Sequence, residues 1–298
     1  MMDMKKQIFL GVLLLFWFGG LRSSEIRYDK DTIKLDLSEQ KVTDEQLQKI
    51  AKTCPNLETL NLNYATGFTH LGVQDVLDKC INLTYFSLWY CKIDFEELNG
   101  YKFKNLGSLS LAYSTITDKG LQNIVKNGLT VWNLDLDTTE IRGEEVDWRK
   151  LSNLEHLILS HSKITDKGLE KISTACKNLY YLEISYTNIT DTGVQHILEK
   201  CVNLTKLYLY GCENIDFTKL NWGKLNKFET LYLGGPAVTE AGLQKILVCP
   251  SLKYLNLEGC ENLRKEWQRI FDGKEDIQKL REQLNPFPDF ARAFSAIF

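Results

Sequence analysis

The chain is poor in residues that interrupt folded domains and in residues that build metal sites. It contains 5 prolines and 4 histidines in 298 residues, and no proline-, serine- or glycine-rich linker divides it. We therefore expect one folded unit. The charges nearly balance, with 36 basic and 39 acidic residues. No basic excess indicates a nucleic-acid partner, and no acidic tract indicates a solvating tail.

Catalytic and cofactor-binding motifs are also missing from the sequence. It has no GxSxG, HExxH, P-loop or GxGxxG pattern, and none of its 8 cysteines forms a CxxC pair. A zinc site of the CxxC kind is therefore not expected. These absences predict a protein that is not an enzyme and that uses no small-molecule cofactor.

The first 24 residues differ from the rest. Lys5 and Lys6 precede the uncharged stretch IFLGVLLLFWFGGL at residues 8–21. This stretch falls short of the roughly 20 apolar residues needed to span a bilayer, and a basic start before a short apolar run is typical of a secretory signal peptide. We predict a signal peptide at residues 1–24 and a secreted or extracytoplasmic protein. An uncleaved membrane anchor, a buried capping helix and a cytoplasmic location are the alternatives.

A short pattern, LxxLxL or a close variant, recurs ten times between residues 32 and 257. The copies start at Thr32, Leu57, Leu83, Leu106, Val131, Leu154, Leu179, Leu204, Phe228 and Leu252, with intervals of 23–26 residues. Both leucines of LxL point to the same face of a short strand. Because one such unit cannot bury its apolar face alone, the copies are expected to stack into a solenoid.

Two kinds of segment follow the predicted strands. Most copies continue like ITDKGLEKISTAC (164–176), in which Thr165 or Asp166 can cap a helix and Leu169 and Ile172 fall at helical spacing. The copies at 83, 131 and 204 continue into IDFEEL, IRGEEV and IDFTKL, which predict shorter 3₁₀ or irregular turns. We predict an α/β solenoid over residues 25–260, with a parallel concave sheet and with helices and irregular turns on the convex side.

The segment after the repeats, residues 261–298, is expected to cap the open end of the solenoid. Leu263, Trp267 and Phe271 are spaced as in an amphipathic helix, and Ile277 and Leu284 predict a second helix that ends before Pro286.

All 8 cysteines occupy two slots of the repeat. Five end the outer segment and three follow the strand: Cys54, Cys80, Cys176, Cys201 and Cys249, then Cys91, Cys212 and Cys260. A small thiol that fills a fixed buried niche explains this placement. Disulfides between neighbouring copies are the alternative, and they would agree better with export because secreted proteins usually oxidise their cysteines.

Two stretches, CKNLYYLEISYTNITDTG (176–193) and CVNLTKLYLYGCENI (201–215), carry a resemblance to a known family. They resemble the cysteine-containing leucine-rich repeat of F-box/LRR proteins, and the resemblance covers about three quarters of the chain. It implies a leucine-rich-repeat horseshoe that binds proteins. In that family a separate F-box docks the adaptor of a ubiquitin ligase. Only 31 residues precede the first copy here, so we expect no F-box, and substrate recognition in an SCF-type pathway is the alternative function.

The residues that flank the LxL leucines are expected to face the concave side. Tyr181, Tyr208, Tyr210, Tyr232 and Tyr254 fall there in four consecutive copies. Tyrosine offers a large contact area with a polar tip and is enriched at binding hot spots. These residues therefore predict an aromatic patch that binds a protein partner.

A second, smaller patch is predicted at Tyr85 and Trp89, with Asp135 and Asp137 between the two patches. His156 and His161 fall close to these carboxylates in the stacked arrangement. Because the spacing fixes no third ligand beside them, we predict no metal site.

Overall fold

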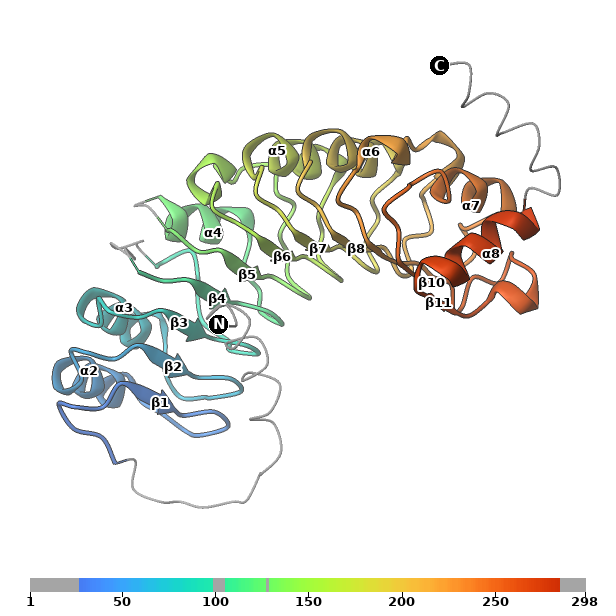
Figure 1. Cartoon of the computed structure of the whole chain (residues 1–298). Coiled ribbons are helices and arrows are strands. Elements are labelled where there is room, and N and C mark those ends of the chain that lie inside the picture. The colour runs from blue at the N-terminus through green and yellow to red at the C-terminus, as the bar shows by residue number, and fades with distance from the viewer. Residues whose placement is uncertain (1–26, 99–104, 127–128, 285–298) are drawn as a thin grey trace.

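The computed structural model describes residues 27–98, 105–126 and 129–284. They form a curved solenoid, with one eleven-stranded sheet along the inner side and helices along the outer side (Figure 1). The strands lie in chain order: β1 (Lys34–Asp36), β2 (Thr59–Asn61), β3 (Tyr85–Ser87), β4 (Ser108–Ser110), β5 (Asn133–Asp135), β6 (His156–Ile158), β7 (Tyr181–Glu183), β8 (Lys206–Tyr208), β9 (Thr230–Tyr232), β10 (Tyr254–Asn256) and β11 (Ile270–Asp272). The predicted leucine-rich-repeat horseshoe is confirmed.

The middle residues of the strands form one buried column through the solenoid. Leu157 of β6 pairs in register with Leu134 on one side and Leu182 on the other, and all three side chains are inaccessible to solvent. Full burial of a leucine is worth about 1.5–3 kcal/mol, and here each leucine is covered by the neighbouring repeats. The first and third residues of each strand are left on the opposite, concave face.

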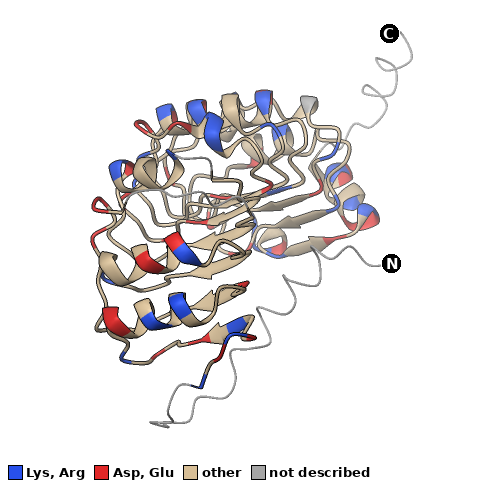
Figure 2. Ribbon diagram, turned by 90° about the vertical axis from the view of Figure 1, so that its left-hand side faces the viewer, with Lys and Arg blue, Asp and Glu red and all other residues tan. Residues whose placement is uncertain are grey.

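Helices cover the convex side of most repeats. They are α2 (Asp44–Thr53), α3 (His70–Lys79), α4 (Asp118–Val125), α5 (Asp166–Ala175), α6 (Asp191–Lys200) and α7 (Glu240–Ile246). Positively and negatively charged residues both occur along these outer helices (Figure 2). Of the repeats that were expected to lack a full helix, those starting at Val131 and Leu204 carry 3₁₀ turns instead, namely η1 (Trp148–Leu151), then η2 (Phe217–Lys219) and η3 (Trp222–Lys224). The one starting at Leu83 continues into an irregular turn over its described residues.

The Thr-Asp pair at the start of the helices has two different tasks. Thr165 caps α5 by accepting a hydrogen bond from the backbone N–H of Gly168 at 3.1 Å. Asp166 reaches the next repeat, where it accepts from the backbone N–H of Thr190 at 2.9 Å and from its hydroxyl at 2.6 Å. The threonine therefore caps the N-terminus of the helix, and the aspartate connects neighbouring repeats.

All eight cysteines are buried and free. Several thiols lie against backbone carbonyls of the preceding repeat: Cys91 Sγ is 3.0 Å from the Leu62 oxygen, and Cys212 Sγ is 3.2 Å from that of Ile184. Burial raises the pKa of Cys91 to about 12, so the thiol form is retained at neutral pH. The structure places the cysteines in packing niches, as the repeat pattern predicts.

The C-terminal end differs from the expected pair of helices. Leu263 to Phe271 do not form a helix; they form the 3₁₀ turn η4 (Lys265–Trp267) and then β11, which pairs antiparallel with β10. The free edge of β10 offers backbone partners that a helix could not use, such as the Lys253 carbonyl, which accepts from Gly273 at 2.8 Å. The second helix is present as α8 (Lys274–Leu284).

The predicted signal peptide, at residues 1–24, lies outside the described residues. Within the described part of the chain, no helix is both long and apolar enough to cross a bilayer.

Candidate functional site

Four of the predicted tyrosines lie together on the concave face. Tyr181 is the first residue of β7, Tyr208 and Tyr232 are the third residues of β8 and β9, and Tyr254 is the first residue of β10. Because the middle residue of each strand is a buried leucine, these side chains are left on the open side of the sheet. We call this set the tyrosine ladder.

The rings of the tyrosine ladder are in continuous contact. Ring centroids are 5.0 Å apart for Tyr181–Tyr208, 4.2 Å for Tyr208–Tyr232 and 5.0 Å for Tyr232–Tyr254. The Tyr208 and Tyr232 rings are stacked, with an interplanar angle of 12°. Burial raises the pKa of Tyr208, and the neighbouring Tyr232 hydroxyl raises that of Tyr254 to about 12. The ladder is therefore uncharged at neutral pH.

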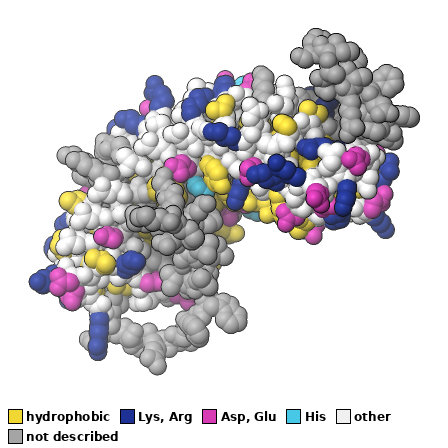
Figure 3. All heavy atoms as spheres, in the orientation of Figure 1, with side chains coloured by type: hydrophobic (Ala, Val, Ile, Leu, Met, Phe, Trp, Pro, Cys, Tyr) yellow, Lys and Arg dark blue, Asp and Glu magenta, His cyan; other side chains and the backbone are white. Residues whose placement is uncertain are grey.

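Two further rings extend the ladder towards the middle of the solenoid. His156, the first residue of β6, stacks on Tyr181 with centroids 5.4 Å apart, and Trp132 contacts His156 edge-on at 5.8 Å. His156 flanks an LxL leucine and is therefore expected on the concave face, but Trp132 was missed because it lies one residue before its strand. Figure 3 shows hydrophobic side chains beside a histidine in the inner curve of the molecule.

Tyr210, the fifth predicted tyrosine, does not join the tyrosine ladder. It lies two residues beyond β8, and its ring contacts Tyr186, with centroids 5.4 Å apart. Gly234 makes room for this ring, since a Cβ atom there would lie 2.1 Å from Tyr210 Cε2. Tyr210 therefore belongs to the edge of the concave face.

An aromatic edge that the sequence analysis missed follows the ends of the strands. Tyr64, Tyr90, Tyr113 and Tyr186 occupy one slot of the repeat and are 41–50% exposed. Their φ angles are 55–60°, in the left-handed region that costs a residue other than glycine about 1–2 kcal/mol. We call these four residues the tyrosine edge. Their regular spacing, four residues after the middle of each strand, is the signal that could have revealed them.

The second predicted patch lies partly on this edge. Trp89 contacts Tyr64 and Tyr113, with centroids 4.9 and 5.6 Å away. Tyr85 lies on β3, and burial raises its pKa. The structure therefore links Trp89 with the tyrosine edge.

Asp135 and Asp137 lie between the aromatic groups, as predicted. Asp135 accepts hydrogen bonds from the Ser110 hydroxyl at 2.9 Å and from the Asp137 backbone N–H at 3.1 Å. Burial raises the pKa of Asp135 to about 6, against the opposing effect of these hydrogen bonds, and burial also raises the pKa of Asp137. Within the described ranges, no group of three or more His, Cys, Asp or Glu side chains could hold a metal ion.

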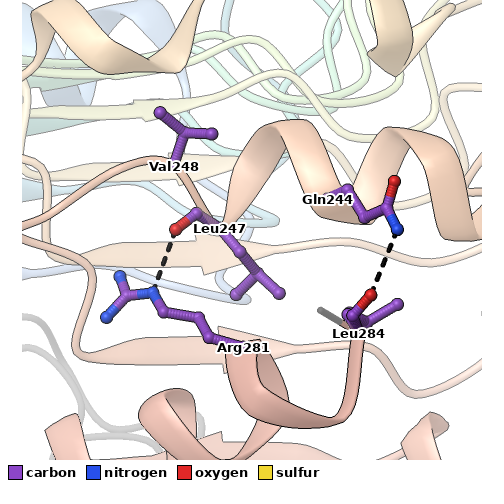
Figure 4. Close-up of a pocket in the computed structure, with 5 residues that line it drawn as sticks. All are labelled: Gln244, Leu247, Val248, Arg281 and Leu284. Atoms are coloured by element: carbon purple, nitrogen blue, oxygen red, sulfur yellow. Dashed lines mark hydrogen bonds between the residues drawn. The ribbon is translucent and has the colours of Figure 1, made fainter. Parts of the chain in front are cut away.

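A small cavity of about 150 Å³ lies away from the concave face, between α7 and α8 (Figure 4). It is lined by Gln244, Leu247, Val248, Arg281 and Leu284. The Arg281 guanidinium donates to the backbone oxygens of Leu247 at 2.9 Å and Cys249 at 2.7 Å, while Gln244 donates to that of Leu284 at 3.3 Å. These contacts fasten the terminal helix to the last helical repeat, so the cavity belongs to the cap.

Comparisons with known proteins agree on the fold. The family model described as "Leucine Rich repeat" matches residues 104–125, 150–173 and 175–198. Among solved structures, the chain is similar to an internalin, inlF, of Listeria monocytogenes, with 21% identity and a TM-score of 0.57. The match covers 77% of this chain and 61% of the internalin chain. No curated protein matches the sequence.

These comparisons show a leucine-rich-repeat fold, and at this identity the internalin carries no further information on function. The resemblance to F-box/LRR proteins, the ubiquitin-ligase alternative and export each stay a prediction.

Proposed function

We propose that this protein is a non-enzymatic scaffold that binds a partner protein on its concave face, through the tyrosine ladder. The observation that carries the proposal is the ladder itself, in which four tyrosines on neighbouring strands are in ring contact. Solenoids of this kind present extended concave surfaces for binding. Tyrosine adds contact area at a low cost in side-chain entropy, because it has only two rotatable side-chain bonds.

The physical support lies in the rigidity of the face. Each ladder residue is attached to a strand whose middle leucine is completely buried, as Leu207 and Leu231 are in β8 and β9. A side chain fixed in this way loses little conformational freedom when a partner binds. Loss of the Tyr208 ring or the Tyr232 ring should therefore reduce the affinity for the partner while the solenoid still folds.

The test uses the wild-type protein and variants as bait for partner proteins from cells that express the chain. Tyr208→Ala and Tyr232→Ala are each expected to weaken binding of a captured partner by more than about 1 kcal/mol, or roughly fivefold, while the melting temperature falls by only a few degrees. The matched control replaces Leu71 and Val202 by Ala, since these are apolar residues of the outer side with 61% and 59% exposure. Equal affinity for the wild type and both tyrosine variants would remove the ladder from the binding site.

A further inference from the structure

Among the described residues, the concave face carries more carboxylates than basic side chains. Its strand and strand-end positions hold two lysines, Lys34 and Lys206, and six carboxylates: Asp36, Asp135, Asp137, Glu183, Glu258 and Asp272. Within the described residues, none of the six carboxylates forms an ion pair, and the pairs that do form lie elsewhere, as between Glu96 and Lys119.

Two of these carboxylates are held in place by neutral donors. Asp135 accepts from the Ser110 hydroxyl and from a backbone N–H. Glu183 accepts from the Tyr181 hydroxyl at 2.7 Å and from the Ser160 hydroxyl at 3.2 Å. Both groups are therefore oriented without a neutralising cation, and a cation supplied by a partner could use acceptor positions that remain open.

The two carboxylates and the tyrosine ladder lie in one row. The register places Asp135 beside Ile158, Ile158 beside Glu183, Glu183 beside Tyr208, and Tyr208 beside Tyr232. Asp135 and Glu183 are two strand spacings apart, which is about 10 Å. In a polyproline II segment, side chains three residues apart point the same way and are separated by about 9.3 Å.

We infer that this row binds an extended polypeptide segment of a partner, with two arginine or lysine side chains three residues apart on Asp135 and Glu183. The residues that follow in the segment lie over Tyr208 and Tyr232. Arginine suits the site best because it pairs with a carboxylate and also stacks on an aromatic ring. The inference rests on the proposed function, to which it adds the chemistry of the partner.

The probe is an acetylated and amidated octapeptide with arginine at its first and fourth positions and proline elsewhere, titrated by calorimetry into the intact protein. A citrulline version removes the charges and keeps the shape, and a third peptide carries its two arginines side by side. The protein variant Asp135→Asn/Glu183→Gln removes both charges, and Glu170→Gln/Glu199→Gln on the exposed side of α5 and α6 is the matched control.

We expect the arginine peptide to bind the wild type and the control variant equally. We expect affinity at least about tenfold lower for the citrulline peptide and for Asp135→Asn/Glu183→Gln, and lower affinity for the adjacent-arginine peptide. The citrulline comparison leaves the protein unchanged, so it does not depend on the folding of a variant.

No binding of the arginine peptide up to about 1 mM, equal binding of the citrulline or adjacent-arginine peptide, or equal binding to Asp135→Asn/Glu183→Gln would each overturn the inference. Capture of a partner that depends on Tyr208 and Tyr232, but not on the two carboxylates, would overturn it while leaving the proposed function intact. Capture of a partner that does not depend on Tyr208 and Tyr232 would overturn both this inference and the proposed function.

Discussion

The rings of Tyr208 and Tyr232 lie face to face, with centroids 4.2 Å apart and planes inclined by 12°. Their strands pair in parallel with these two residues in direct register, so the sheet itself sets the stack. Because each ring partly covers the other, the free energies that they contribute should be coupled. The contact between the two rings can therefore be tested in solution without a partner.

A double-mutant cycle with Tyr208→Ala and Tyr232→Ala should reveal this coupling. We expect a coupling free energy of unfolding of about 0.5–1.5 kcal/mol, as found for aromatic pairs in contact. Urea unfolding of the wild type, both single variants and the double variant provides the measurement. Strict additivity of the two single changes would mean that the rings do not stack in solution.

Asp118 should be among the residues on which stability depends most. Its carboxylate accepts four backbone N–H groups of the next repeat, from Arg142, Gly143, Glu144 and Glu145, at 2.7–2.9 Å. Asp118→Asn replaces one acceptor oxygen by an NH₂ group and removes the charge, so we expect a loss of about 2–3 kcal/mol in unfolding free energy. The exposed Glu213→Gln serves as control, and an equally small loss for both variants would show that this carboxylate is dispensable.

Thr138 occupies the slot of the tyrosine edge with φ 52°, a conformation that is strained for a β-branched residue. In later repeats the same slot holds Gly211, Gly235 and Gly259, with φ of 68°, 92° and 77°. We expect Thr138→Gly to stabilise the protein by about 0.5–1 kcal/mol, since relief of strain exceeds the entropic cost of glycine. Thr138→Ala keeps most of the strain. If the alanine variant melts as high as the glycine variant, the backbone there is not left-handed.

The raised pKa of Asp135, about 6, predicts a pH-dependent effect of Asp135→Asn. The folded state holds the proton more tightly than the unfolded state, so the wild type loses stability as pH rises from about 4 through 6. Asparagine does not titrate in this pH range. The unfolding free energy of the variant should therefore rise relative to that of the wild type between about pH 4 and 6. After allowance for partial exposure to solvent we expect about 1 kcal/mol.

Urea unfolding of both proteins at pH 4.5 and 7.5 measures this difference. The charges on Asp137 and Glu183 also raise the pKa of Asp135. Asp137→Asn removes one of these charges, so it should lower the pKa of Asp135 and reduce the pH range over which the stability difference changes. A stability difference that stays constant between the two pH values would contradict the raised pKa.

The leucine pattern was enough to predict the solenoid, because a buried column of Leu134, Leu157 and Leu182 follows directly from strand alternation and the repeat interval. The end of the sheet could not be predicted in the same way. Trp267 and Phe271 fit a helical spacing, but the edge of β10 supplies hydrogen bonds to an extended segment. The spacing of apolar residues within a segment contains no information about such an edge, so it could not predict β11.

The candidate site was predictable only in part. Strand alternation places Tyr181, Tyr208, Tyr232 and Tyr254 on the concave side, and the structure does so. Tyr210 lies two residues beyond β8, where strand alternation alone does not decide the ring contacts, and its ring contacts Tyr186 and not the tyrosine ladder. The tyrosine edge was missed because residues with positive φ are seldom tyrosine.

Photo-crosslinking from position 208 shows whether a partner protein lies over the tyrosine ladder. A benzophenone amino acid replaces Tyr208 in one protein and Leu71, on the outer helix α3, in another. We expect a covalent adduct with the partner from position 208, a weaker one when Tyr232 is also changed to Ala, and none from position 71. An adduct that forms from position 71 and not from position 208 would place the partner on the convex side, away from the tyrosine ladder.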